Sequence, residues 1–223
     1  MPGPDDIGFA ARCLARATRQ ASLATVSDGA PFVSLVTPAM TCGGDLLMLI
    51  SSLSRHGRHL RHDGRCAVLL GGALPEAESP ANPQAAPRLT LTGTAELTDD
   101  PLLRERWVRI HPYGALYAGF GDFSLWRLRP EEAHFVAGFG QISRLPAAML
   151  RPACDIGAQE RALLDLVGSG AIIALDADGF DLGPGPTMDP NGEARTRRIA
   201  FAAPAETPEA IETAIASMFN GGL

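Results

Sequence analysis

The sequence predicts an α+β protein in which an antiparallel β-barrel is followed by a small α+β domain. Short segments of strand type follow one another, with turn residues between them and only one or two helices inserted, which is typical of an antiparallel barrel. Acidic residues outnumber arginines 11 to 5 from residue 150 onward, whereas the two are equal in number before it. We therefore predict a barrel domain over 1–148 with an N-terminal helix, and an acidic domain over 149–223.

The elements of the barrel are predicted in order from residue 5. Apolar residues at helical spacing indicate a helix from Asp5 to Gln20, with Asp5 as its N-cap. The dipeptide Asp28-Gly29 predicts a hairpin turn, because glycine accepts the positive φ that such turns need. The other predicted elements are strands at 21–27, 31–40, 46–51, 65–71, 88–98, 123–129 and 133–139, helices at 53–62 and 101–110, a loop at 72–87 and a turn at 130–132.

The acidic domain is expected after a linker. Residues 141–156 contain two prolines and no strong periodicity, which favours a connection rather than an element. The final helix has Thr207 as N-cap and Pro208 at its first position, and ends at Gly221-Gly222. Before it we predict a helix at 158–167, a strand at 171–175, a turn at 176–179 and a strand at 195–201.

Composition and charge exclude several classes of protein. All 19 basic residues are arginine, so lysine Schiff-base chemistry and the P-loop and kinase arrangements are excluded. A net charge of −6 without a broad basic face argues against nucleic-acid binding. No apolar run approaches the roughly 20 residues of a membrane span, and the N-terminus lacks a secretory pattern. We expect a cytoplasmic protein, outside membranes, with four reduced cysteines.

The most informative segment runs from Ser51 to Cys66. Between Arg55 and Arg65 it holds four arginines and three histidines against a single acid. It follows an apolar run that is typical of a buried strand. Serine hydroxyls, the N–H groups at a helix start and fixed positive charge together favour a phosphate or carboxylate ligand. The alternative is a solvated helix face that only keeps the protein soluble.

A second candidate feature is aromatic. The two tryptophans and two tyrosines all lie between Trp107 and Trp126. Such rings suit a planar cofactor or a subunit interface, and they equally suit packing of a helix onto the barrel. His111 and His134 are isolated histidines, which are most often structural.

Five segments, in this order, carry a resemblance to a known superfamily. They are Ala24-Thr25 with Gly29-Ala30-Pro31, Ser51–Leu60, Arg88–Gly93, His111–Phe123 and Ala133–Gly140. Together they resemble the FMN-binding split β-barrels related to pyridoxamine 5′-phosphate oxidase, and more closely the haem-utilisation (HugZ-like) branch. The resemblance implies a split barrel that forms a homodimer, with FMN in the groove between barrels. Residues around its phosphate would be Ser51, Ser52, Arg55, His56 and Arg58.

The sequence also departs from the relatives that it resembles. Ser34 stands where the oxidase relatives carry a phosphate-binding arginine, and His59 replaces the asparagine usual in the haem branch. No histidine follows His134, so a haem ligand from the end of this chain, which some relatives use, is ruled out. The C-terminal substrate motif of pyridoxamine 5′-phosphate oxidation is not recognisable either.

Three hypotheses follow from the resemblance. The first, which we favour because the phosphate segment is largely kept, is an FMN-dependent oxidoreductase. The second is a haem-binding or haem-degrading protein, with His134 or His111 as iron ligand and Asp122 as a partner of that ligand. The third is a non-catalytic carrier or regulator, because a fold does not fix a function.

Overall fold

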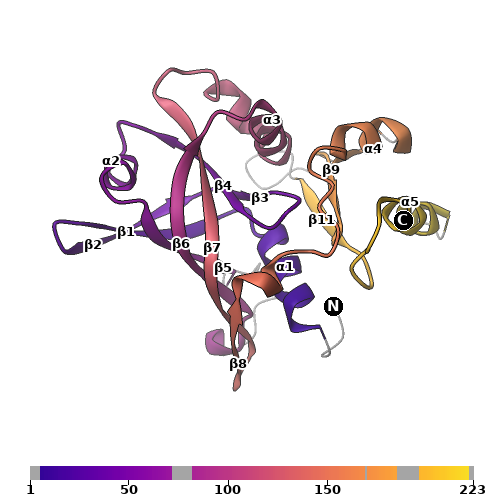
Figure 1. Cartoon of the computed structure of the whole chain (residues 1–223), viewed down its shortest axis with the longest axis horizontal. Helices are drawn as coiled ribbons and strands as arrows, with labels where there is room; N and C mark the ends of the chain where they lie inside the picture. Colours follow the sequence, from indigo (N-terminus) through magenta and orange to yellow (C-terminus); the bar gives the residue numbers. More distant parts are fainter. Residues whose placement is uncertain (1–5, 72–81, 169, 185–195, 221–223) are drawn as a thin grey trace.

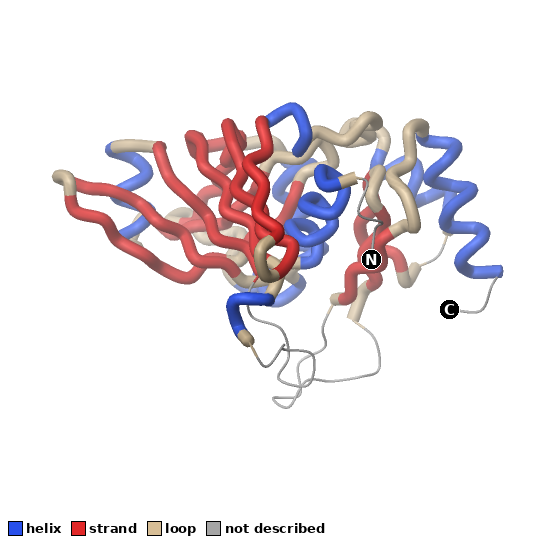
Figure 2. Tube along the Cα trace, turned by 90° about the horizontal axis from the view of Figure 1, so that it is seen from below, coloured by secondary structure: helices blue, strands red, loops and turns tan. Residues whose placement is uncertain are grey.

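The computed structural model describes residues 6–71, 82–168, 170–184 and 196–220. It confirms the α+β class and the large antiparallel sheet of a split barrel, which is strongly curved and not closed. A second, three-stranded sheet lies beside it, and helices fill the space between the two (Figures 1 and 2). Within the described residues, no helix is long and apolar enough to cross a membrane.

The large sheet has eight strands in the described part of the chain. Their order is β2-β1-β5-β6-β7-β4-β3, with β8 paired to β7 beside β4. All neighbouring strands are antiparallel. The bounds are β1 Ala21–Ser27, β2 Ala30–Val36, β3 Pro38–Met40, β4 Leu46–Ser51, β5 Arg65–Gly71, β6 Arg88–Thr98, β7 Phe123–Gly138 and β8 Gln141–Pro146.

The remaining elements are five helices, three short 3-10 helices and the three strands of the second sheet, counted over the described residues. The α-helices are α1 Ile7–Ala17, α2 Arg55–His62, α3 Pro101–Ile110, α4 Glu160–Val167 and α5 Pro208–Asn220. The 3-10 helices are η1 Pro83–Ala85, η2 Pro112–Leu116 and η3 Ala147–Leu150, and the strands are β9 Ile172–Asp176, β10 Gly179–Leu182 and β11 Arg197–Ala200. Asp6 is the N-cap of α1. Several predicted features lie outside the described residues: the cap Asp5, most of the 72–87 loop, Arg195 and the end of the last helix at Gly221-Gly222.

The hairpin turn between β1 and β2 is confirmed. Asp28 and Gly29 both have positive φ, at 52° and 76°, as a two-residue turn of this kind requires. The predicted turn at 130–132 is wrong, because β7 continues through it. Pro130 faces Gly93 of β6, where the register shifts, and a Cβ on Gly93 would lie 2.1 Å from the Arg129 carbonyl oxygen. A glycine opposite the proline therefore allows a bulge instead of a chain reversal.

Other predicted boundaries also need correction. The strand predicted over 31–40 is two strands, because the chain leaves the β1 ladder after Val36 and β3 then pairs with β4. The linker predicted over 141–156 contains β8 and η3; Pro146 is the last residue of β8, and Pro152 follows η3. The second sheet also contains β10, which was not predicted and begins at Gly179, the last residue of the predicted turn.

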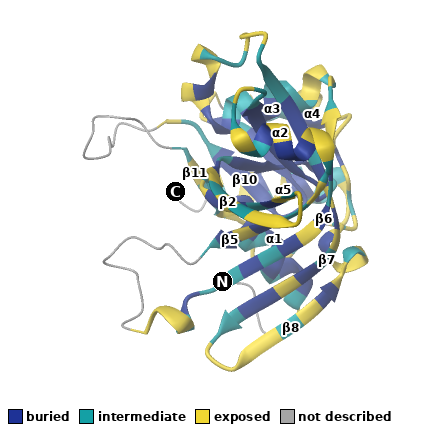
Figure 3. Ribbon diagram, turned by 90° about the vertical axis from the view of Figure 1, so that its left-hand side faces the viewer, coloured by how far each residue is buried: buried dark blue, intermediate teal, exposed yellow. Residues whose placement is uncertain are grey.

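Three apolar clusters form the core. The inner face of the curved sheet packs against α1 and α2, and exposed and buried residues alternate along β6 and β7 (Figure 3). The other face of β4 is covered by α3, where Leu47 and Leu49 pack around Trp107. The third cluster lies around Phe180, between the second sheet and α4 and α5. Thus α3 lies between the two sheets (Figure 2).

A buried ionic cluster joins the second sheet to the barrel. We call it the seam cluster; its members are Arg12 and Arg16 of α1, Arg106 of α3, Arg198 of β11, and Asp176 and Asp178 of the β9–β10 turn. None of these side chains is more than 7% exposed. Buried charges need such pairing, since an isolated one would be strongly destabilising. The predicted turn at 176–179 is therefore the point where the two sheets are tied together.

Candidate functional site

The predicted cofactor residues come together where β4 ends and α2 begins. The Ser51 hydroxyl donates to Asp122 Oδ2 at 2.5 Å, and the Ser52 amide donates to the Asp122 carbonyl oxygen at 2.8 Å. Ser54 is the N-cap of α2, accepting from the Gly57 amide at 3.0 Å. The serines thus fix the turn to the start of β7, and Ser51 is already engaged by a carboxylate.

The helix α2 carries positive charge that its own surroundings do not neutralise. Arg55, Arg58 and Arg61 have no carboxylate partner among the residues that the structure describes, whereas Arg65 pairs with Asp63 at 2.6 Å. Arg58 instead donates to the Leu53 carbonyl oxygen at 2.5 Å. Most other arginines of the described chain are paired with acids. An anionic group would therefore form stronger electrostatic interactions at α2 than at those paired arginines.

Three residues that the sequence analysis did not place in the site hold Arg55. Its guanidinium lies over the Phe32 ring, 4.4 Å from the centroid, and its Nε lies 3.4 Å from His59 Nε2. His59 Nδ1 lies 3.0 Å from the hydroxyl of buried Thr25. Thr25 and Phe32 are register partners in the β1–β2 ladder. Strand alternation could have shown that both face α2.

His56 and Ser34 contribute little to the binding of an anion at α2. Burial, and then the neighbouring His59, lower the pKa of His56, so it stays neutral near pH 7 and adds no charge for an anion. The Ser34 hydroxyl is buried without a hydrogen-bond partner in the described structure. It cannot replace an arginine as a phosphate contact.

A second candidate surface is the uncovered outer side of the large sheet. We call it the exposed sheet face; it is formed by Ser22, Ala24, Val26, Val33, Leu35, Ala67, Leu69, Thr90, Thr92 and His134. One row of successive register partners crosses six strands: Leu35, Ser22, Leu69, Thr90, His134 and Arg144. Val33 and Leu35 are 62% and 61% exposed. Neighbouring exposed apolar residues of this kind mark an interaction surface.

The histidines differ sharply in availability. His134 is exposed, and its side chain has no partner within the described structure. His111 is 2% exposed, with Nε2 2.8 Å from the Pro38 carbonyl oxygen and Nδ1 3.2 Å from the Tyr113 hydroxyl. Both of its ring nitrogens are occupied, so His111 is not available as an iron ligand. His59 is occupied in the same way, whereas His134 keeps free nitrogens.

The two candidate surfaces lie on opposite sides of the sheet. Thr25 and Phe32, which contact α2, point inward, whereas Ser22 and Leu35, in the row of His134, point outward. Asp122 lies at the α2 end, just before β7, and pairs with Ser51, so it is not a partner of His134. One copy of the chain cannot bring α2 and His134 to the same ligand.

The aromatic block divides between the core and the surface. Trp107 and Trp126 are 0% and 4% exposed, so both tryptophans are packing residues. Tyr113 and Phe120 are 44% and 59% exposed on the segment between α3 and β7. The packing interpretation therefore holds for the tryptophans, while exposed Phe120 lies two residues before Asp122.

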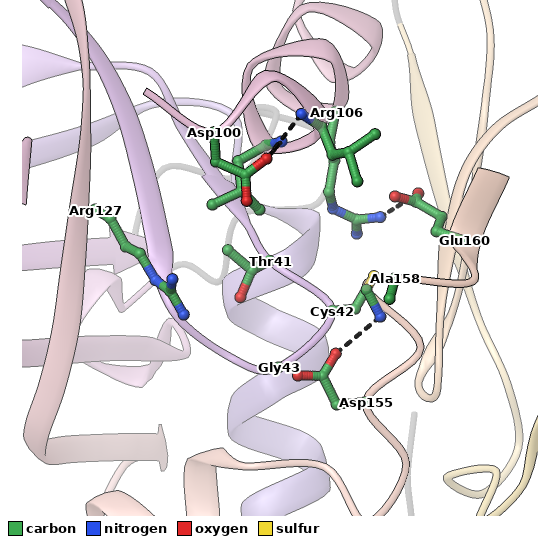
Figure 4. A pocket seen from close by; sticks show the side chains of 12 residues that line it. Thr41, Cys42, Gly43, Asp100, Arg106, Arg127, Asp155, Ala158 and Glu160 are labelled. Atoms are coloured by element: carbon green, nitrogen blue, oxygen red, sulfur yellow. Dashed lines mark hydrogen bonds and ion pairs between the residues drawn. The ribbon is translucent and has the colours of Figure 1, made fainter. Parts of the chain in front are cut away.

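A pocket of about 240 Å³ opens beside the seam cluster (Figure 4). Its charged groups already have partners: Arg106 bonds Glu160, and Asp155 accepts from the Gly157 amide. Burial raises the pKa of the Cys42 thiol to about 12, so no thiolate forms there. Cofactor pockets are usually about 300–1,000 Å³. This pocket is therefore too small for a flavin or a haem.

The fold defines the chain as a split-barrel protein, and its α2 carries a cationic surface that is the candidate site for an anion. The family model of pyridoxamine 5′-phosphate oxidase matches residues 10–137, more than half of the chain. The chain belongs to this family, and its likeness to haem-utilisation proteins places it in the HugZ-like branch.

Two relatives and one solved structure are informative. The chain is 31% identical over 114 residues to the "Non-canonical heme oxygenase HOZ, chloroplastic" of Arabidopsis thaliana, covering 50% of this chain but only 33% of that protein. It is 31% identical over 128 residues to "Heme oxygenase HutZ" of Vibrio cholerae, covering 53% of this chain and 69% of that one. The fold matches protein Atu2129 (unknown function) from Agrobacterium tumefaciens, with a TM-score of 0.74, 24% identity and 96% of each chain covered.

Proposed function

We propose that this chain binds haem as its substrate, in line with the haem alternative rather than the flavin one that the sequence favoured. The observation that carries the proposal is His134, an open imidazole in a row with exposed Leu35 and Leu69. Haem offers an iron that accepts an imidazole nitrogen and an apolar ring that would cover such side chains. The relatives named heme oxygenases support the same choice.

We further propose that the site is completed in a homodimer. A haem held by His134 could reach the arginines of α2 only if these belong to a second copy, because the two surfaces lie on opposite sides of one sheet. The propionates of haem are anions, and Arg55, Arg58 and Arg61 lack carboxylate partners in the described structure. Packing of the α2 side of each copy against the exposed sheet face of the other would also cover Val33 and Leu35.

The test is a haemin titration followed by absorbance. Wild-type protein should bind stoichiometrically with a histidine-ligated spectrum, and His134→Ala should lose it because a methyl group cannot donate to iron. His62→Ala is the matched control, since His62 is also exposed and makes no hydrogen bond in the described structure. An unchanged spectrum in His134→Ala would refute the ligand assignment.

The same sample tests the reaction. Adding a reductant in air should bleach the haem if the chain degrades it, as its relatives' names suggest. Stable haem under these conditions would favour the carrier hypothesis and exclude the enzyme. We also propose a cytoplasmic location for the protein.

FMN is the second candidate, and one observation favours it specifically. The unneutralised arginines follow Ser51-Ser52 at the start of α2, which suits a single terminal phosphate. Arg55→Ala should weaken FMN by about 1.5–3 kcal/mol, the scale of a charge-assisted hydrogen bond. Riboflavin, which has no phosphate, should be unaffected. Equal losses for both flavins in a fluorescence titration would mean that Arg55 supports the fold instead.

A further inference from the structure

His59 lies almost buried beneath α2, at 8% exposure, in a cluster that connects β1, β2 and the helix. Its Nδ1 is 3.0 Å from the Thr25 hydroxyl and its Nε2 is 3.4 Å from Arg55 Nε. Its ring meets Phe32 edge to face, with centroids 5.6 Å apart. Every polar atom of the imidazole therefore has a partner.

The chemistry of these partners determines the state of His59. The Nε–H of arginine can only donate, so His59 Nε2 must accept and carry no proton. The remaining proton then lies on Nδ1, where it is donated to the Thr25 hydroxyl oxygen. His59 is thus a neutral imidazole in a single tautomer.

Arg55 is held on two sides by this arrangement. The Phe32 ring contacts the face of the guanidinium, and His59 accepts from Nε at its inner edge. The two Nη groups have no partner among the described residues. A guanidinium fixed in this way loses less conformational freedom when it binds an anion than a freely rotating one.

We propose that His59 is a positioning residue that presents Arg55 to the anionic group of the ligand, with Thr25 fixing the His59 tautomer. This rests on the proposed role of α2 as the surface that receives a phosphate or propionate. His59 itself does not touch the ligand. Its contribution should therefore disappear when Arg55 is absent.

The experiment is a double-mutant cycle, measured by calorimetry with FMN, riboflavin, haemin and inorganic pyrophosphate as probes. Arg55→Ala should weaken the anionic probes at least about tenfold. His59→Leu, which removes the acceptor, should weaken them about two- to tenfold. His59→Gln, whose amide oxygen can accept from Arg55, should recover most of the loss. Adding His59→Leu to Arg55→Ala should have no further effect.

Riboflavin and a chemical readout separate positioning from a general loss of structure. His59→Leu should leave riboflavin affinity unchanged, and imidazole nitrogen NMR of wild-type protein should show the Nδ1–H tautomer at pH 7. An additive loss in the double variant, or the other tautomer, would overturn the proposal.

Failure of the proposed function would look different. If neither cofactor binds but pyrophosphate binds in a manner that depends on both Arg55 and His59, the inference stands and the proposed function fails. If haemin or FMN binds and His59→Leu changes nothing, the proposed function stands and the inference fails. If no anionic probe depends on Arg55, the inference fails, whereas the proposed function then stands or falls on whether haemin binding depends on His134.

Discussion

Replacing Asp176 with asparagine should destabilise the whole chain, because this carboxylate is the centre of the seam cluster. It is 0% exposed and accepts from Arg16 at 2.9 Å, from Arg106 at 3.1 Å and from both Nη groups of Arg198 at 2.9 and 2.6 Å. An asparagine removes the charge and puts an N–H₂ group against guanidinium donors. The three arginines would remain buried and incompletely compensated.

Leaving a buried ion without its partner costs about 3–5 kcal/mol. For a chain of 223 residues this corresponds to a fall in melting temperature of about 6–20 °C. Thermal and urea denaturation of Asp176→Asn at pH 7 would measure it. Asp63→Asn is the control, because its ion pair with Arg65 is exposed to solvent and should hardly affect the midpoint. A loss below about 1 kcal/mol in Asp176→Asn would refute the argument.

The pH dependence gives the same prediction an independent test. Burial alone would raise the pKa of Asp176, but Arg16, Arg198 and Arg106 outweigh it and hold the pKa well below its usual range. A carboxyl with a depressed folded pKa stabilises the native state above its unfolded pKa of about 3.9, and this stabilisation is lost as the pH falls toward the folded value. The difference between wild type and Asp176→Asn should therefore be full at pH 6 and shrink below about pH 4.

Two further predictions concern other parts of the molecule. Leu35→Glu on the exposed sheet face should convert a dimer into a monomer in sedimentation velocity. The control Leu116→Glu, at a position 80% exposed on η2, should leave the dimer intact. A dimer that survives Leu35→Glu would place the interface elsewhere. Burial lowers the pKa of His111 to about 4, so its imidazole NMR signals should not titrate between pH 8 and 6. In the unfolded state His111 has a pKa near 6.5 and binds a proton more readily than in the folded state. The free energy of unfolding should therefore decrease as the pH falls from about 6.5 to 4. A titration midpoint of the His111 NMR signals above pH 6 would contradict this.

Most strands of the large sheet and the helix α2 could be predicted from local signals, because alternation, turn residues and caps act within a few positions. The bulge at Pro130 could not, since it depends on Gly93, which is distant in sequence and adjacent only once β6 and β7 have paired. β10 was missed for a similar reason. Its short sequence gains strand character from pairing with β9 and β11.

The same distinction between local signals and tertiary contacts applies to the candidate site. The charge of α2 was evident from its composition, and so was an isolated histidine in β7. The availability of each imidazole was not, because it depends on tertiary partners such as the Pro38 carbonyl of His111. Arg12 and Arg16 are spaced as on the polar side of an ordinary surface helix. Only the structure reveals that this side is buried against Asp176 and Asp178.

The seam cluster also imposes an order of events during synthesis. Arg12 and its partner Asp178 are 166 positions apart, so the carboxylate is made about 8–30 s after the arginine at ~5–20 residues per second. Through that interval α1 cannot acquire its final neighbours, however early its helix forms. The packing around α1 is therefore completed only after the last third of the chain has been synthesised. The barrel and the second sheet then complete folding as one unit.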